Sequence, residues 1–350
     1  MTGRSYWSIV VLVLVGAAIA LYLNSQRQLL TAFQNVSLSA VIYLIALRLL
    51  FLVTNGLFLR EFASKFGVRL VVKEWFGLSA VTTMGNYITP FSGGLIARAT
   101  YLKHRYAFPY AQFATVLASS YLVMFWVVGV VGVLALVTFV GAAPLFWKVV
   151  PLFAAVVMVI SALVVLPAIK LPWNNRITRI INTSLEGWAL VKNDRLLLTR
   201  LVAYTLINIL LNGLSFWMAY RLLGSSISLA TALLISLLAV FSILVNVTPG
   251  NLGIQEAVIS LSSGLLGAGA GQGLLVALLI RAATLALAFT LGPVFSVLLT
   301  RELTAHQLAS MPSASDKEQA SEEFAGDPWS KNWAWFILSA TGQRKWLTNL

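Results

Sequence analysis

The sequence contains no cysteine, only two histidines and few charged residues. The missing cysteines exclude disulfides, thiol catalysis and thiolate metal sites. His104 and His306 alone leave little for a buried catalytic metal, so we predict no metal site and no cofactor. Charged residues make up 10% of the 350 residues and hydrophobic residues 59%. Soluble domains carry about 25% charged residues. The composition therefore excludes an ordinary soluble enzyme or a disordered chain, and it indicates a protein whose surface is solvated by lipid.

Acidic residues are also scarce. The chain has 11 of them against 24 lysines and arginines, which gives a net charge of +13. A strongly basic chain can bind nucleic acid, but here the basic residues flank apolar stretches. We interpret them as orientation signals and as contacts with anionic lipid headgroups. The predicted partners are therefore membrane lipids, and no nucleic acid.

Six apolar stretches are long enough to cross a bilayer, which takes roughly 17–25 residues of helix. They are residues 6–23, 38–58, 111–140, 147–168, 200–220 and 274–299. The first lacks a clear small-residue cleavage site and a longer stretch follows it, so we interpret it as a retained helix and not a signal peptide. The sequence thus predicts an all-α polytopic integral membrane protein with about six transmembrane helices.

Two further apolar regions, 76–97 and 229–267, are interrupted by proline and glycine. The breaks contain Asn86, Pro90, Gly93 and Gly94 in the first region, and Asn246, Pro249, Gly250 and Gly253 in the second. Proline removes a backbone donor and glycine loosens the chain, so the freed groups need protein or water around them. We predict two re-entrant broken-helix hairpins with these prolines and glycines as hinges. The two asparagines line a polar path or, alternatively, only cap the broken helices.

The distribution of basic residues predicts the orientation. They cluster in residues 59–75, 97–110 and 169–200, and placing all three segments inside puts both ends of region 76–97 on the cytoplasmic face. Region 229–267 then enters from the outside, and both termini are cytoplasmic. Two ordinary crossings, at 229–247 and 253–268, are the alternative for the second region. We accordingly expect the chain in the cytoplasmic membrane.

The two broken regions share a pattern of asparagine, Thr-Pro, glycine and a charged residue. On the predicted topology the unit 38–140 runs opposite to the unit 200–299, and each unit places one span before its hairpin and one after it. Inverted repeats with broken helices are typical of transporters whose substrate lies near the bilayer midplane. Coincidence is the alternative, because proline and glycine are common in membrane helices.

Two arginines, Arg48 and Arg98, lie in or beside apolar segments without an acidic partner in their half, where we place Glu61 and Glu74 in a loop. A charge at the bilayer centre costs about 2.5–3.5 kcal/mol on insertion scales, so these side chains must face protein or water. Guanidinium forks match phosphate oxygens, and the pair predicts a phosphate clamp. Arg98 has an alternative position at the cytoplasmic interface.

The second half carries Glu256 and Arg281 at similar depth, and each is available to the other. We predict a buried pair that acts as a gate or a coupling site. A salt bridge that only holds helices in register is the alternative.

These motifs resemble a known family. The stretches 90–94, 98–103 and 248–256, together with Arg281, are similar to the lysylphosphatidylglycerol synthase transmembrane, or flippase-like, family over roughly residues 5–300. The resemblance implies a multi-spanning domain that moves lipids or lipid-linked glycans between leaflets. Its best-known members add a soluble aminoacyltransferase domain. Only 51 residues follow residue 299 here, so we do not expect that activity. Many members also place an acidic residue beside the first arginine, where this chain has Leu95, Ile96 and Ala97.

The predicted domains are a flippase-like transmembrane domain over residues 1–300, a flexible polar linker over 301–328 and an aromatic, basic interfacial segment over 329–350. The last segment is too short and too broken to span, and it fits a membrane interface. Docking of a soluble partner, such as a glycosyltransferase, is the alternative.

We therefore hypothesise a transporter, not an enzyme, that moves an anionic lipid or lipid-linked glycan across the bilayer. Arg48, Arg98, Asn86 and Asn246 would contact the substrate. The alternatives are a membrane-embedded lipid-headgroup transferase, for which Glu256 is the only deep carboxylate, and a non-transporting scaffold of a glycan-assembly complex. The phosphate-binding motif of ATP-driven proteins is absent from the sequence.

Overall fold

The computed structural model describes residues 37–139, 149–165, 178, 182, 188, 191–245 and 247–310. Every regular element in this part of the chain is helical, which confirms the predicted all-α polytopic membrane protein. The predicted span 6–23, Asn246 and the tail beyond residue 310 lie outside the described residues.

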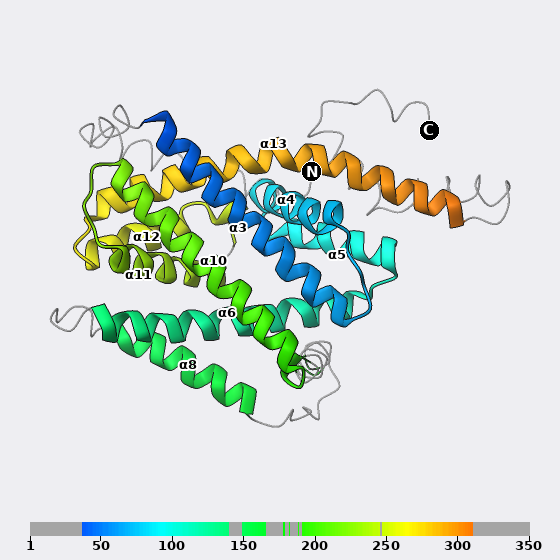
Figure 1. The fold of residues 1–350 in the computed structure, drawn as a ribbon, viewed down its shortest axis with the longest axis horizontal. Helices are drawn as coiled ribbons and strands as arrows, with labels where there is room; N and C mark the ends of the chain where they lie inside the picture. The colour runs from blue at the N-terminus through cyan, green and yellow to red at the C-terminus, as the bar shows by residue number, and fades with distance from the viewer. Residues whose placement is uncertain are drawn as a thin grey trace.

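Four long helices are long and apolar enough to cross a membrane. They are α3 (Leu38–Lys65), α6 (Tyr110–Phe139), α10 (Arg195–Leu222) and α13 (Ala270–Ser310). A shorter apolar helix, α8 (Val150–Val165), runs beside α6 in Figure 1. These five helices coincide with five of the six predicted spans.

Each interrupted region forms a pair of short helices. The first pair is α4 (Val72–Ile88) and α5 (Gly93–Tyr106). The second pair is α11 (Leu229–Val240) and α12 (Ile254–Leu265), with the short 3₁₀ turns η1 (Phe241–Val245) and η2 (Pro249–Asn251) between them. Figure 1 shows the two pairs in opposite halves of the molecule, both lying along α13.

The two breaks differ in how they use glycine. In the second break, Gly250 and Gly253 have φ of 58° and 84°, the left-handed region that only glycine adopts freely. In the first break, Phe91 and Ser92 have the positive φ, at 54° and 55°. Gly94 instead allows close packing of α5 on α4, because a Cβ there would lie 2.0 Å from the Thr82 carbonyl oxygen.

The tips of the two pairs meet inside the bundle. A Cβ on Gly250 would lie 2.2 Å from Cδ1 of Tyr87, so the turn of the second pair packs directly on the last turn of α4. The second helix of this pair, α12, has 12 residues and extends about 18 Å at 1.5 Å per residue, which is less than the ~30 Å hydrocarbon core. This geometry favours the predicted re-entrant hairpin at 229–267 over two ordinary crossings.

One end of the bundle gathers the charged residues. Lys65 binds Asp194 at 2.7 Å, Arg200 binds Glu61 at 2.9 Å, and Lys73 binds Glu302 at 2.6 Å. These ion pairs join the end of α3, the starts of α4 and α10, and the C-terminal part of α13. The positive-inside rule predicts that this end faces the cytoplasm.

The predicted placement of Glu61 and Glu74 in a loop is wrong. Glu61 belongs to α3, which continues past the expected limit of residue 58 because its last turns pair with the start of α10. Glu74 lies in the first turn of α4, where its carboxylate accepts a hydrogen bond of 3.0 Å from the Val71 amide.

The helix order supports the interpretation as an inverted repeat. A long helix, a short pair and a long helix occur twice, and α3 packs along α10. Three side-chain contacts join α3 to α10, and their residue numbers rise along α3 while they fall along α10. They are Arg48–Asn212, Asn55–Asn208 and Glu61–Arg200. The two helices are therefore antiparallel. The unit bounds 38–140 and 200–299 stay a prediction.

We predict that single cysteines introduced into this cysteine-free chain report the topology. Arg221→Cys, at the end of α10, should react with a membrane-impermeant maleimide in intact cells. Lys103→Cys, at the charged end, should react only after the cells are permeabilised.

Val247→Cys tests the second hairpin, because its side chain is exposed at the tip. A tip held at membrane depth should stay unlabelled from either side, and the unmodified chain supplies a background without thiols. Labelling of Val247→Cys from the inside at the rate of Lys103→Cys would show two ordinary crossings instead.

Candidate functional site

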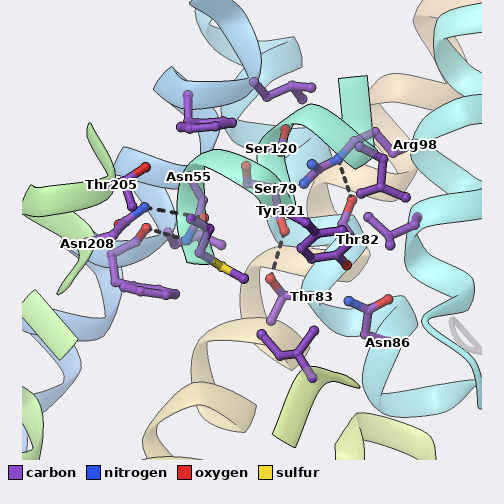
Figure 2. A pocket seen from close by; sticks show the side chains of 18 of the residues that line it. Asn55, Ser79, Thr82, Thr83, Asn86, Arg98, Ser120, Tyr121, Thr205 and Asn208 are labelled. Carbon is purple, nitrogen blue, oxygen red and sulfur yellow. Dashed lines mark hydrogen bonds between the residues drawn. The ribbon is translucent and has the colours of Figure 1, made fainter. Parts of the chain in front are cut away.

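A cavity of about 440 Å³ lies between the two halves of the molecule. Its wall comes from α3, α4, α5 and α6 of the first half, and from α10, α13 and the α11–η1 segment of the second (Figure 2). The polar lining residues are Arg48, Asn55, Ser79, Thr82, Thr83, Asn86, Arg98, Ser120, Tyr121, Thr205, Asn208, Asn212 and Thr284.

The lining combines two cations with an apolar wall. No carboxylate is among the residues that line the cavity in the described part of the chain. Phenylalanines and aliphatic side chains make up the remainder, among them Phe51, Phe58, Phe62 and Phe113. Such a surface can hold an anionic group that is attached to an apolar chain.

Arg48 is held by neutral partners. Its side chain is 7% exposed, its Nε donates to Ser215 Oγ at 3.2 Å, and its Nη2 donates to Asn212 Oδ1 at 2.9 Å. The guanidinium also lies over the Phe51 ring, 5.3 Å from the ring centroid. A buried charge without a counterion is costly, so this position favours an anionic ligand.

Arg98 projects from α5 toward the same cavity, as Figure 2 shows. Its Nε donates to Thr82 Oγ1 at 2.9 Å, and it forms no ion pair with any residue that the structure describes. The residues at the charged end of α5 are Lys103 and Arg105. The side chain turns inward along α4, and the alternative position of Arg98 at the cytoplasmic interface stays a prediction.

Glu256 and Arg281 contact each other, as the sequence suggested. Arg281 Nε donates to Glu256 Oε1, and both side chains are buried, with 8% and 2% exposure for the arginine and the glutamate. The arginine also donates to the carbonyl oxygens of Gly250 at 2.8 Å and Asn251 at 3.5 Å. The pair therefore ties α13 to the tip of the second hairpin, and its role as a gate stays a prediction.

Tyr87 links this tip to the first hairpin. The Arg281 guanidinium lies 5.5 Å from the centroid of the Tyr87 ring, and Gly250 packs on the same ring. One arginine thus contacts both hairpin tips. Tyr87 could not be predicted from the sequence, because the local pattern gives no sign of a contact between segments so far apart in the chain.

Asn86 caps the broken helix, which was its alternative role. Its Oδ1 accepts a hydrogen bond of 3.0 Å from the Gly94 amide, and the same side chain lines the cavity. Asn246 lies outside the described residues.

Other polar residues of the site were missed. Asn55, Asn208 and Asn212 line the cavity from α3 and α10, and Asn208 Nδ2 lies 3.5 Å from Asn55 Oδ1. These three residues could have been predicted from the sequence, since each is an isolated amide within an otherwise apolar span.

The first half also contains a buried carboxylate. Glu74 accepts hydrogen bonds from the hydroxyls of Tyr101 at 2.9 Å and Tyr106 at 2.5 Å, with Arg105 Nε at 3.6 Å. These partners lie at the charged end of the bundle, so Glu74 does not neutralise Arg98. Among the described residues, no group of three or more histidine or acidic side chains is placed to hold a metal ion.

Comparison with known sequences gives one family match. The family described as the lysylphosphatidylglycerol synthase TM region matches residues 7–292. A comparison with curated proteins gives no match.

We predict that the Glu256–Arg281 pair holds the second hairpin in place. Glu256→Gln and Arg281→Gln should each lower the free energy of unfolding by about 3–5 kcal/mol, because each leaves a buried charge unpaired. The double variant should lose less than the sum of the two, since neither charge remains. Denaturant unfolding in mixed micelles measures all three changes.

The exposed ion pair between Glu61 and Arg200 is the matched control. Glu61→Gln and Arg200→Gln should cost about 0–1 kcal/mol each, because solvent screens that pair. If Glu256→Gln costs no more than Glu61→Gln, the buried pair does not hold the hairpin.

Proposed function

The chain belongs to the family of the lysylphosphatidylglycerol synthase TM region, and we propose that it moves an anionic lipid or a lipid-linked glycan from one leaflet of the cytoplasmic membrane to the other. The observation that carries this proposal is that Arg48 and Arg98 both line one cavity, and that no carboxylate is among its lining residues in the described part of the chain. The two arginines come from separate helices, α3 and α5, and reach the same space.

The charge of the cavity supports a phosphate as the group that it binds. Arg98 uses Nε for Thr82, and Arg48 uses Nε and Nη2 for Ser215 and Asn212. These neutral partners orient the guanidiniums and leave their charges uncompensated. Guanidinium groups bind phosphate oxygens through paired, charge-assisted hydrogen bonds, and low dielectric strengthens such bonds.

The apolar part of the wall supports a lipid over a water-soluble phosphate. Phe51, Phe58, Phe62 and Phe113 lie beside the polar groups in the same cavity. A lipid can place its headgroup against the arginines and the start of its chain along these rings. An inorganic phosphate or a soluble sugar phosphate would leave the apolar wall without contacts.

The meeting of the two hairpin tips suggests how access could alternate. Arg281, Glu256 and Tyr87 join the tips where α4 and the second break pack together. We propose that separating this contact opens a path, and that Pro90, Pro249, Gly250 and Gly253 act as hinges while Gly93 and Gly94 keep α5 close to α4.

An enzymatic role has less support. A headgroup transferase needs a base within reach of its substrate, whereas Glu256 is engaged by Arg281 and is not among the residues that line the cavity. We therefore propose a transporter and not an enzyme. A scaffold role beside a glycosyltransferase would instead predict that Arg98 and Glu256 tolerate substitution.

We predict that Arg98→Gln slows the movement of a fluorescent phosphatidylglycerol in proteoliposomes by about tenfold or more. The reason is the loss of a charge-assisted contact, which is worth about 1.5–3 kcal/mol, and 1.4 kcal/mol is tenfold. Dithionite quenching of the outer leaflet measures the rate.

Arg301→Gln is the matched control, because it removes the same charge from the exposed end of α13. It should leave the rate unchanged. Equal rates for the wild type, Arg98→Gln and protein-free vesicles would contradict transport and favour the scaffold role.

A further inference from the structure

Asn212 holds Arg48 without cancelling its charge. Arg48 Nη2 donates to Asn212 Oδ1 at 2.9 Å, and Arg48 Nε donates to Ser215 Oγ at 3.2 Å. An arginine side chain has only donors, so the amide atom that faces it must be the oxygen. A carboxylate would accept the same hydrogen bond but would neutralise the guanidinium, whereas the amide leaves the positive charge in place. The residue type at position 212 therefore keeps Arg48 available for an anion.

The same contact fixes where the other end of the amide lies. The oxygen and the nitrogen of a planar amide are about 2.3 Å apart, so Asn212 Nδ2 lies within about 5 Å of Arg48 Nη2. Asn212 lines the cavity and is partly exposed, and its Nδ2 donates to no described residue. This nitrogen is also not among the described polar atoms that are both buried and unpaired. The amide therefore presents its NH₂ group to the cavity beside the guanidinium.

Two donors at this spacing fit the oxygens of a single phosphate. Each N–H···O bond spans about 2.9 Å, so donors about 5 Å apart can bind two oxygens of one group. Arg48 Nη1 forms no hydrogen bond with a described residue, which leaves the guanidinium a charged donor for the ligand. The two side chains come from α3 and α10, one long helix from each half. A phosphate that both of them bind would therefore join the two halves across the cavity.

We propose that Asn212 is a further binding residue for the anionic headgroup, and that its Nδ2 donates to the phosphate that Arg48 binds. This inference rests on the proposed function, because it adds one ligand to the same site. Asn212 thus has two effects, since its oxygen orients Arg48 and its nitrogen contacts the substrate. A residue that only positioned Arg48 would have the first effect alone, and the two cases differ in what their variants do.

The test measures the binding of a fluorescent phosphatidylglycerol to the full chain in mixed micelles, which does not require transport. The midpoint of a saturation curve gives Kd and does not depend on the folded fraction of a variant. Arg48→Gln and Arg98→Gln should each raise Kd, which places the lipid in the cavity. Asn212→Leu should raise Kd about tenfold, as expected for the loss of a hydrogen bond to a charged group. An unchanged Kd for Asn212→Leu would overturn the inference.

Ser215→Ala separates direct binding from positioning. Ser215 also accepts a hydrogen bond from Arg48, but its side chain is fully buried and is not among the residues that line the cavity. The substitution loosens Arg48 without removing a donor from the cavity, so it should raise Kd much less than Asn212→Leu. Equal rises for the two variants would show that Asn212 acts only by positioning Arg48, and the inference would be overturned.

Two more variants control for the kind of substitution. Asn208→Leu makes the same change one helical turn away on α10, where the amide donates to Asn55 at 3.5 Å, and it should leave Kd unchanged. Asn212→Asp keeps an oxygen that accepts from Arg48, but it removes the donor and cancels the charge. It should therefore weaken binding more than Asn212→Leu does. Binding by Asn212→Asp at the wild-type Kd, or an equal loss in Asn208→Leu, would contradict the assignment of Asn212.

The remaining outcomes separate this inference from the proposed function. If the variants behave as expected but the wild type does not move phosphatidylglycerol in proteoliposomes, transport is overturned and the assignment of Asn212 stands. If inorganic phosphate displaces the lipid as well as unlabelled phosphatidylglycerol does, the site takes a soluble anion, and the lipid part of the proposed function is overturned. If the wild type binds neither probe, or if Arg48→Gln and Arg98→Gln leave Kd unchanged, the cavity is not the binding site and the inference falls.

Discussion

Lipid offers no hydrogen bonds to a helix that breaks at membrane depth, and the architecture of this protein depends on how that demand is met. In the second break, Arg281 binds backbone carbonyl groups that the helices leave without a partner. Its guanidinium donates to the carbonyl oxygens of Gly250 and Asn251 and pairs with Glu256 at the start of α12. The Glu256 carboxylate in turn accepts the Gly253 amide at 2.7 Å. One charged pair thereby satisfies the loose backbone on both sides of the turn, and it lets the second hairpin stop inside the bundle against Tyr87.

The positions of the acidic residues explain why the cavity is positive. The acidic residues of the described helices are engaged elsewhere, with Glu256 at the tip and Glu74, Glu61, Glu302 and Asp194 at the charged end. At that end the Leu197 amide and the Lys65 ammonium hold the pKa of the Asp194 carboxyl below its usual range. Arg48 and Arg98 are left with hydroxyl and amide partners. In a medium of low dielectric such a pair attracts an anion strongly, and it makes a positively charged ligand costly.

Several features of the site follow from local pattern. Apolar runs of sufficient length indicated α3, α6, α8, α10 and α13, and the Thr-Pro and glycine motifs located both breaks. The rarity of charge at membrane depth pointed to Arg48, Arg98, Glu256 and Arg281, because each must have a partner or a ligand. Local pattern was less successful with glycine. Gly94 and Gly250 look alike in the sequence, yet one permits two helices to approach and the other adopts a left-handed turn.

Local sequence is enough to indicate that this chain spans a membrane, where its helices break and which charged residues at membrane depth need a partner. These properties depend on the transfer of single segments into lipid, and that energy is a sum over neighbouring residues. Which groups face each other depends on how the helices pack in three dimensions. Asn55 meets Asn208 because α3 and α10 pack antiparallel, and Tyr87 meets Arg281 because two hairpins end at the same depth. Such contacts join residues more than 150 positions apart, and their register is set by the packing of whole helices, which no local pattern records.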